Sequence, residues 1–362
     1  MPNPSSIKIG AAQIKLLESL CAASAISGQE GEVRKLVMDA LKGHADEISV
    51  DALGNVLAVK KAAARNRPRV MLAAHMDEVG FLIAGDDKDG IFRFDPVGGL
   101  DARQLVGKSV IVGKDHVAGV IGFKPIHLTT ASERTTAATI DGLRIDTGNG
   151  ANGKVKVGDR AAFAPNFIQL GSGRTRTIRS KALDDRIGVA TLIELVKNAP
   201  PNIELLAAFT TQEEISVRGA SVAAHAFNPD LAIILDCTPA YDLPHWDGAE
   251  NERYNTRLGF GPAIYTADKG TLSDPRLIRF LTETAEAQGI AFQLRQPGGG
   301  GTDAEGVHKA RAGIPSVSVS VPGRYLHTAA SLVRVSDWQD TLRLVHAALA
   351  AVKPSLLKAD RA

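Results

Sequence analysis

Apolar residues along the chain recur with two periods, one typical of helices and one typical of buried strands. Residues 30–45 place apolar side chains three and four positions apart and end near Gly43, a common helix stop. Residues 48–60 alternate around a turn, which predicts a hairpin. Residues 69–75 form a continuous apolar run, as in a strand covered on both faces. The same alternation of predicted helices and strands returns from residue 181 to residue 352.

The stretch between residues 81 and 163 has a different pattern. Short apolar runs are separated by turn-forming sequences about every ten residues, and no long helical period appears. This pattern predicts a small all-β sandwich or barrel. The chain is therefore expected to fold as an α/β domain, residues 1–78 and 174–362, interrupted by a β domain over residues 79–173.

Composition and charge narrow the functional classes. The 362 residues are 44% apolar, which is ample for a large core, and 42 Lys and Arg against 40 Asp and Glu leave a net charge of +2. That balance provides no basic surface for nucleic acid, and no apolar run approaches the roughly 20 residues needed to cross a membrane. Lys15 and Glu18 interrupt any signal peptide, and Cys21 and Cys237 fit free thiols better than one disulfide. We expect a cytoplasmic protein.

Polar residues that end apolar runs are the first candidates for chemistry, because functional side chains of α/β sheets gather beyond the carboxyl ends of strands. Two histidines and several carboxylates in such places suit a divalent metal of the zinc type. Any one of them is more often a cap or turn residue, so their joint placement carries the hypothesis. The candidates are His75, Asp77, Asp184, Glu213, Glu214, Asp236 and His327.

Two of these pairs have specific alternatives. His75 and Asp77 face the same side of an extended chain, so the carboxylate can orient the ring, although Asp77 can equally be a helix cap. Glu213 and Glu214 point to opposite sides, so one can bind metal while the other acts as a base. The alternative for this pair is a solvated helix start.

Other polar motifs are more ambiguous. Asp184 and Asp185 precede a predicted helix, where capping alone explains one of them, and Arg186 can pair with either. The glycine-rich residues 298–306 lack the lysine of a phosphate-binding loop, so close backbone approach to a site is the better interpretation. Cys237 is interpreted as a buried thiol rather than a nucleophile.

Six motifs in order resemble one known family. They are LAAHMDEVGF, KALDDRIG, TTQEEISVRGA, AIILDCTPA, GGGGTDAEG and VPGRYLHT, and the β insertion adds VGGLDARQLVGKSV and GVIGFKPIHL. Together they resemble the tetrahedral (TET) aminopeptidases, which are glutamyl-aminopeptidase-like peptidases with two cocatalytic metal ions, some once labelled endoglucanases. The resemblance covers most of the chain. It implies a mixed sheet sandwiched by helices, as in zinc exopeptidases, with an inserted β-barrel-like domain for oligomerisation.

The resemblance also implies a role for each candidate. His75 and Asp236 would bind one ion, Asp184 would bridge both ions, and Glu214 and His327 would complete the second. Glu213 would be the general base and later the acid, Asp77 would orient His75, and Asp185 would not be a ligand. Three carboxylates and a hydroxide balance two divalent ions, so the inner shell would be neutral. Zinc is expected, with cobalt or manganese as alternatives.

The same resemblance implies short peptides as substrates and self-association into dimers and a tetrahedral dodecamer. The alternatives are a deacylase or carboxypeptidase with two metal ions, a catalytically silent structural homologue, and a glucanase, which would leave both histidines without a role. The chain departs from the usual family motifs at Tyr241, Gly323 and Glu305. Tyr241, with His245 and Trp246, is expected to reshape the cavity or an assembly contact, and Glu305 to favour basic or polar N-terminal residues if it faces the specificity pocket.

Overall fold

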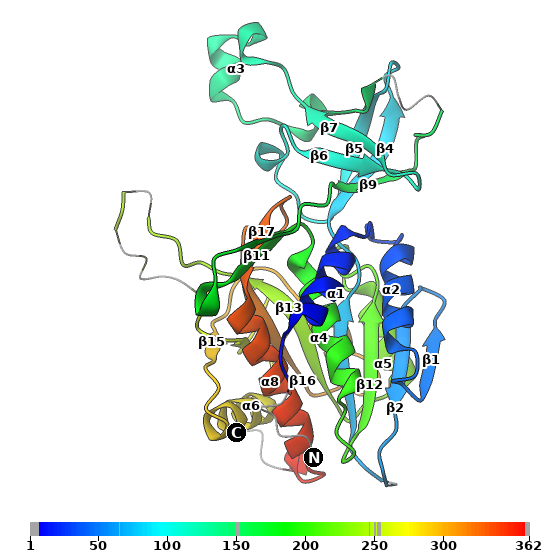
Figure 1. Cartoon of the computed structure of the whole chain (residues 1–362), viewed down its shortest axis with the longest axis vertical. Coiled ribbons are helices and arrows are strands. Elements are labelled where there is room, and N and C mark those ends of the chain that lie inside the picture. The colour runs from blue at the N-terminus through cyan, green and yellow to red at the C-terminus, as the bar shows by residue number, and fades with distance from the viewer. Residues whose placement is uncertain are drawn as a thin grey trace.

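A large mixed sheet forms the centre of the molecule, and a small barrel lies beyond one end of it (Figure 1). The structure is a computed structural model that describes residues 7–64, 66–148, 153–245, 247–249, 251 and 255–358. Over these residues the sheet has eleven strands, in the order β1-β2-β12-β3-β13-β16-β17-β11-β10, with β14 and β15 attached beside β16. Strands β12, β3, β13 and β16 are parallel, so their carboxyl ends share one edge.

The strands of this sheet have the following bounds: β1 Glu47–Val50, β2 Val56–Lys60, β3 Arg69–His75, β10 Ile168–Leu170, β11 Thr177–Ser180, β12 Glu204–Thr210, β13 Leu231–Pro239, β14 Ala263–Tyr265, β15 Gln293–Arg295, β16 Ser316–Arg324 and β17 Ser331–Arg334. The central strands are buried along nearly their whole length, because helices cover both faces. This explains the continuous apolar runs in the sequence.

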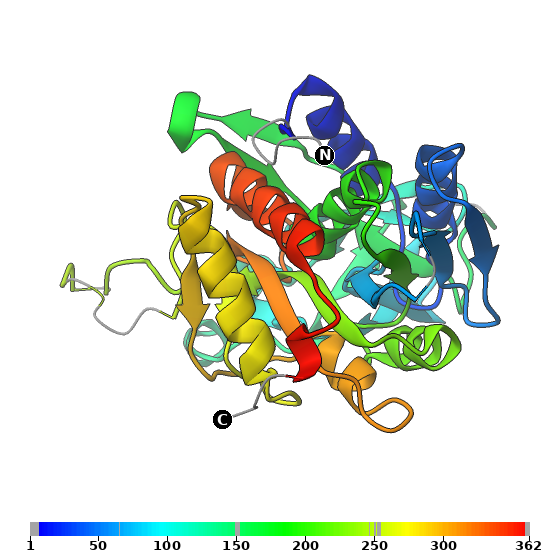
Figure 2. The same ribbon diagram turned by 90° about the horizontal axis from the view of Figure 1, so that it is seen from below.

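Helices divide unequally between the two faces of the sheet, as the view from below shows (Figure 2). One face packs against α1 (Ala11–Ala22), α2 (Gly31–Leu41), α4 (Leu183–Lys197), α6 (Pro275–Ala287) and α8 (Val335–Ala351). The other packs against α5 (Arg218–Phe227) and the short α7 (Ala304–His308). Trp338 is fully buried in the larger core, and its Nε1 donates to Thr191 Oγ1 at 2.8 Å, joining α8 to α4.

The barrel closes in the order β4-β5-β8-β7-β6-β9. Its strands are β4 Gly80–Asp86, β5 Ile91–Val97, β6 Ser109–Val112, β7 Val117–Gly122, β8 Arg144–Asp146 and β9 Arg160–Phe163, and the short helix α3 (Ala131–Thr135) lies between β7 and β8. Phe81 is fully buried at its centre and meets Phe94 and Phe163 edge to face, with ring centroids 5.0 and 5.3 Å away. Closure removes exposed strand edges, so a small β unit can be stable.

The expected fold class is therefore confirmed, a mixed sheet between helices with a small β unit inserted after β3. The domain boundaries given above stay a prediction. Within the described residues, single 3-10 turns lie at Ala102–Gln104, Ile126–Leu128, Ile140–Gly142, Gly173–Thr175 and Leu356–Lys358. Within the described residues, every helix is too short or too polar to cross a membrane.

Candidate metal centre

Six of the seven candidate residues line one cavity of about 970 Å³ at the carboxyl edge of the sheet, on the side of the barrel. They come from five different places in the topology. His75 ends β3, Asp236 lies in β13, Asp184 begins α4, Glu213 and Glu214 follow β12, and His327 follows β16. The seventh, Asp77, lies fully buried just behind His75.

The cavity residues form two ligand groups that share Asp184. Among the described residues, His75, Asp184 and Asp236 form one group, and Asp184, Glu214 and His327 the other, with ligating atoms within 4.8 Å of one another in each. Asp184 Oδ1 lies 3.1 Å from His75 Nε2, whereas Asp184 Oδ2 lies 3.5 Å from His327 Nε2. The two oxygens of one carboxylate therefore face two different histidines.

The remaining contacts complete each group. Asp236 Oδ1 lies 3.9 Å from His75 Nε2, and Glu214 Oε2 lies 3.3 Å from His327 Nε2. The other ring nitrogens face carbonyl oxygens: His75 Nδ1 is 3.1 Å from Asp77 O, and His327 Nδ1 is 2.9 Å from Gly99 O. Because a carbonyl only accepts, Nδ1 carries the proton in the neutral rings and leaves the Nε2 lone pair for a ligand.

The carboxylates of the two ligand groups lie close together in a buried site, and this changes their pKa values. Burial, and then repulsion from Asp184 and Asp185, raises the pKa of Asp236 well above its usual range. Burial likewise raises the pKa of Glu214 to about 7, although His327 opposes this. Buried carboxylates this close together need compensating positive charge.

Both histidines respond to the same excess of negative charge. Burial opposes a charge on His327, but its hydrogen bond with Asp184 and the nearby Glu214 raise its pKa to about 10. Burial opposes a charge on His75 as well, and hydrogen bonds with Asp184 and Asp77 raise its pKa well above the usual value. The site thus carries an excess of buried negative charge around the two histidines. Imidazole nitrogens with carboxylate oxygens are a donor set that fits divalent metals.

Asp77 joins three parts of the site rather than capping a helix. It accepts hydrogen bonds from Ser27 Oγ at 2.6 Å and from the backbone N–H groups of Glu213 at 3.0 Å and Glu214 at 3.2 Å. Its Oδ1 lies 3.6 Å from His75 Nδ1. No helix follows it, because the chain continues into β4, so the helix-cap alternative is wrong.

The solvated-helix alternative for the two glutamates is wrong as well. Helix α5 begins only at Arg218, and the Glu214 side chain is 4% exposed. Glu214 belongs to the group with His327, whereas Glu213 belongs to neither ligand group among the described residues. Burial raises the pKa of Glu213 well above its usual range, with His75 opposing and Asp236 and Glu214 adding to the effect.

The Asp184–Asp185 segment shows which residue caps α4. Asp185 Oδ1 accepts from the backbone N–H of Gly188 at 3.0 Å, so Asp185 performs the capping and Asp184 is left for the cavity. The peptide bond between the two is cis. Pairing of Arg186 with either aspartate was a wrong prediction. Its Nη2 lies 3.0 Å from Glu78 Oε1, because Glu78, three residues after the end of β3, is brought against α4.

A buried ion cluster behind the site was missed by the sequence reasoning. Glu78 accepts from Lys181 Nζ at 2.7 and 2.8 Å and from Arg186, and all three side chains are buried. Glu78 and Lys181 fall inside motifs already singled out, next to Asp77 and three residues before Asp184. Their charges alone did not indicate an ion cluster, because only the fold shows that these side chains are buried. Gly99 was missed because it contacts His327 through its backbone carbonyl, which its residue type does not reveal.

The residues that depart from the family motifs have different locations. Glu305 lines the cavity, whereas Tyr241 is 55% exposed and is not among the residues that line it. His245 donates its backbone N–H to Ala249 O at 3.1 Å, and Trp246 lies outside the described residues. A Cβ at Gly323 would lie 3.0 Å from Cys237 Sγ, so this position favours glycine.

The two cysteines are buried thiols, and the backbone of the glycine-rich loop comes close to the cavity. Cys21 and Cys237 are both free and buried. Burial, and then the carboxylates of Asp184 and Asp185, raises the pKa of Cys237 well above its usual value, so its thiol stays protonated. Gly299, Gly300 and Gly301 line the cavity directly.

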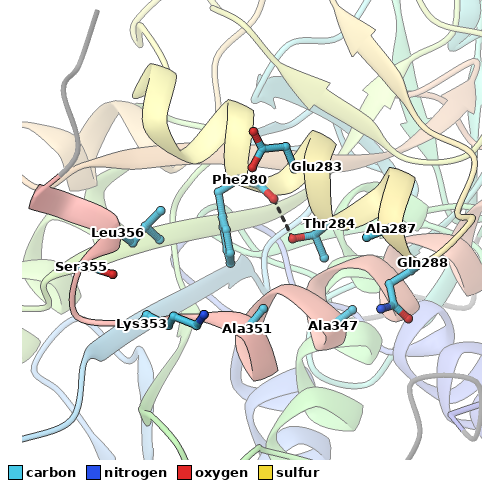
Figure 3. A pocket seen from close by; sticks show the side chains of 10 residues that line it. All are labelled: Phe280, Glu283, Thr284, Ala287, Gln288, Ala347, Ala351, Lys353, Ser355 and Leu356. Carbon is cyan, nitrogen blue, oxygen red and sulfur yellow. Dashed lines mark hydrogen bonds between the residues drawn. The ribbon is translucent and has the colours of Figure 1, made fainter.

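A second cavity of about 410 Å³ lies between α6 and α8, toward the end of the sheet opposite the barrel (Figure 3). Phe280 and Leu356 project into it, and Thr284 Oγ1 donates to the Phe280 carbonyl at 2.6 Å. Its only ionisable lining residues among those described are Glu283 and Lys353. It lacks the clustered ligands of the first cavity.

Comparisons with known proteins agree on one family. A family model described as M42 glutamyl aminopeptidase matches residues 54–344. The lysyl aminopeptidase of Pyrococcus furiosus is 33% identical over 351 residues, covering 94% of this chain and 97% of the relative. An aminopeptidase structure from Desulfurococcus kamchatkensis superposes with a TM-score of 0.89 at 32% identity, covering 96% of this chain and 97% of that one. The Pyrococcus horikoshii TET1 peptidase, which can assemble into a tetrahedron or a large octahedral shell, superposes with a TM-score of 0.80 at 29% identity, covering 94% and 100%.

Proposed function

This chain belongs to the M42 glutamyl aminopeptidase family, and we propose that it is an aminopeptidase that removes N-terminal residues from short peptides with the help of two divalent metal ions. The observation that carries the proposal is the position of Asp184. Its two oxygens face His75 and His327 from between two ligand groups, as a bridging carboxylate would. His75 and Asp236 would hold one ion, and Glu214 and His327 the other.

The ions would supply Lewis-acid chemistry, lowering the pKa of the attacking water and polarising the scissile carbonyl. Glu213 is the proposed general base. Its carboxyl lies in the same cavity but outside both ligand groups, so it is left to accept the proton of the attacking water. A pKa raised by burial lets the same carboxyl return that proton to the leaving amine. Asp77 would hold His75 and, through its two backbone hydrogen bonds, the segment that carries both glutamates.

We further propose that the chain forms a homo-oligomer, through dimers to a tetrahedral dodecamer, with residues 79–173 as the oligomerisation domain between the two parts of the catalytic domain. The assembly of the Pyrococcus horikoshii TET1 peptidase, a relative over nearly the whole chain, supports this. Zinc is the proposed metal, with cobalt or manganese as alternatives. Two free thiols support a cytoplasmic location.

The test is hydrolysis of aminoacyl p-nitroanilides and their N-acetylated counterparts by chelator-treated protein, with zinc, cobalt or manganese added back. We expect activity that requires metal and a free α-amine. Cleavage that ignores acetylation would indicate a deacylase or an endopeptidase instead. Protein that binds two ions and cleaves nothing would favour a catalytically silent homologue.

The ligand assignment has its own test in metal stoichiometry. Asp184→Asn removes the one residue common to both groups, so we expect neither ion to survive dialysis. Asp236→Asn affects only the group of His75, so one ion should remain. Plasma mass spectrometry measures the number of ions that each variant retains, and circular dichroism verifies that both variants are folded. Equal loss of metal in both variants would contradict the bridging role of Asp184.

A further inference from the structure

The segment that carries Glu213 and Glu214 forms a closed loop after β12, which we call the glutamate loop (residues 211–219). The backbone N–H of Gly219 donates to Thr211 O at 3.0 Å, which brings the two ends of the loop together. Between these ends, Glu213 O accepts from the N–H groups of the third and fourth residues after it, at 3.0 and 2.9 Å. The proposed base and one proposed ligand therefore lie on a single short piece of backbone.

The backbone of the glutamate loop is strained. Gln212, Ser216 and Val217 have φ angles of +58°, +103° and +48°, in the left-handed region that residues with a side chain rarely adopt. The conformation is most unfavourable for Val217, which is β-branched. Such conformations persist only where surrounding contacts hold the backbone. The loop therefore needs contacts from outside to keep the two glutamates in place.

Asn55, in the turn between β1 and β2, supplies contacts at both ends of the glutamate loop. Its Oδ1 accepts from the backbone N–H of Thr211 at 2.8 Å, and its Nδ2 donates to Gly219 O at 3.0 Å. The side chain is fully buried, and a Cβ on Gly219 would collide with its Oδ1. The turn reaches this place because β2 pairs with β12, with Val56 opposite Phe209. One amide thus joins both ends of the loop to the hairpin.

Asp51 fixes the orientation of this amide. Its Oδ2 accepts from Asn55 Nδ2 at 2.6 Å, and its Oδ1 accepts from the backbone N–H groups of Leu53, Gly54 and Asn55, each at 3.0 Å. Because a carboxylate only accepts, the nitrogen of the amide faces Asp51 and the oxygen is left for the N–H of Thr211. The turn therefore presents one acceptor and one donor to the glutamate loop in a defined arrangement.

We propose that Asn55 is a positioning residue for the proposed reaction. It holds the ends of the glutamate loop, while Asp77 holds the backbone N–H groups of Glu213 and Glu214. Asn55 acts through the loop, because neither it nor Asp51 is among the residues that line the cavity. The inference rests on the proposed function for the roles of the two glutamates, whereas the contacts that hold the loop belong to the fold alone.

Asn55→Ala is the first test, because it removes both contacts and leaves the loop sequence unchanged. In titrations of zinc against a chelator, we expect the ion at Glu214 and His327 to bind about tenfold to a hundredfold more weakly, as when a residue that orients a metal ligand is lost. The other ion should keep its affinity, because His75 and Asp236 lie on β3 and β13. At saturating metal, kcat should stay about tenfold or more below that of the parent while KM changes little, the pattern of a misplaced catalytic group.

Asn202→Ala is the matched control at the other end of β12. Asn202 Nδ2 donates to the backbone carbonyls of Leu349 and Val352 at 3.1 and 3.2 Å, so this substitution also removes two hydrogen bonds to the backbone. We expect its urea midpoint to fall, whereas kcat and the affinity for both ions should match the parent. Equal effects of Asn55→Ala and Asn202→Ala on kcat and metal affinity would overturn the proposal, because Asn55 would then contribute only stability.

Asp51→Asn tests the same arrangement without changing Asn55, and this isosteric change in a surface turn should preserve folding. The new amide must turn its nitrogen toward the backbone N–H groups of the turn or toward Asn55 Nδ2, and neither can accept a hydrogen bond. We expect kcat and the affinity of the weaker ion to fall by about threefold to tenfold, as for one lost hydrogen bond. Asp46→Asn, the same change just before β1, should have no such effect. Parent values of both quantities in folded Asp51→Asn would overturn the proposal.

Hydrogen exchange tests the contacts without metal or turnover. In metal-free protein, peptides that cover residues 211–219 should exchange at least about tenfold faster in Asn55→Ala than in the parent, because the loop opens more readily once its contacts are lost. The same peptides should keep the parent rate in Asn202→Ala. Parent-like protection in Asn55→Ala would overturn the inference. If the parent protein binds no metal and cleaves nothing, the proposed function fails, yet this measurement still decides whether Asn55 holds the loop.

Discussion

At the residue scale, the chemistry depends on which side of an extended segment each carboxylate faces. Glu213 and Glu214 are neighbours, yet Glu214 contacts His327 while the charge of Glu213 interacts with His75 and Asp236. One step along the chain therefore separates a proposed ligand from a proposed base. Both residues are partly buried and line the same cavity, so their difference in role comes from direction rather than from exposure.

Glu213→Gln is expected to keep the fold and both ions while kcat falls about a hundredfold to ten-thousandfold, because an amide cannot accept the proton of water. The substitution preserves shape, and Glu213 belongs to neither ligand group. Activity on an aminoacyl p-nitroanilide and metal content should be measured on the same preparation. Glu214→Gln is the matched control and should lose an ion. Loss of metal from Glu213→Gln instead would mean that the two glutamates have exchanged roles.

The sequence predicted the candidate site residues better than it predicted which side chains the nearby charged residues contact. His75, Asp236 and the glutamates were found because polar residues at the ends of apolar runs meet at one edge of a sheet. Arg186 was assigned the wrong partner, because its true partner, Glu78, is more than a hundred residues away in sequence. Arg295 lies in no motif that was singled out, and the absence of a carboxylate partner for it among the described residues is visible only in the folded chain.

At the element scale, the segment after β3 is joined to α1 and α4 by the buried cluster around Glu78. Lys181 Nζ also donates to Ala23 O at 2.9 Å, and Arg186 Nη1 donates to Leu20 O at 3.1 Å, so both cations tie the end of α1 to the start of α4. Burial lowers the pKa of Lys181, and Glu78 opposes this shift. Helix periods predicted each helix, but this connection between them depends on side chains that converge only in three dimensions.

Glu78→Gln is expected to lower the free energy of unfolding by about 3–5 kcal/mol, because it leaves two buried cations without their carboxylate. Urea denaturation followed by circular dichroism at neutral pH measures the change. Glu286→Gln, on the exposed side of α6, is the control and should change stability by no more than about 0.5 kcal/mol. A comparable, small effect in both variants would mean that the cluster contributes little.

His346 on α8 is expected to make stability depend on pH. Its ring is buried, Nε2 donates to Asn198 O at 3.1 Å, and burial lowers its pKa. The folded state therefore binds this proton less readily than the unfolded chain, whose histidine titrates at about 6.5. The stabilisation is complete above that pH and is lost as pH falls through the lower folded value. Urea titrations from pH 7.5 to 5 should show this fall, and His346→Gln should flatten it; an equal slope in the variant would contradict the assignment.

At the scale of the whole molecule, the barrel is part of the site as well as an inserted unit. Its loop after β5 supplies the Gly99 carbonyl that faces His327, and a Cβ at Gly98 would lie 3.4 Å from the Glu214 Cβ. On another side, His116 between β6 and β7 contacts Glu32 of α2, with Nε2 and Oε1 2.6 Å apart. If copies of the chain contact one another through the barrel, those contacts are therefore linked to the positions of the proposed metal ligands His327 and Glu214.

The barrel also has exposed apolar side chains close together in sequence, which is unusual for an isolated surface. Val120, Phe123, Ile126 and Leu128 are 40%, 43%, 63% and 67% exposed, over nine residues from β7 into the following turn. If this stretch is buried between copies of the chain, the double substitution Ile126→Asp and Leu128→Asp should yield a smaller species. Light scattering coupled to size-exclusion chromatography measures the mass.

The double variant should keep its thermal unfolding midpoint, because neither side chain contributes to the barrel core. It should also keep activity on a small chromogenic substrate, since the cavity is lined by other residues. Met38→Asp on α2, 39% exposed, is the control for adding a charge at an apolar surface position and should leave the mass unchanged. A monomeric parent protein at micromolar concentration would contradict the proposed assembly itself. A double variant that retains the full mass would show that the copies meet through a different surface.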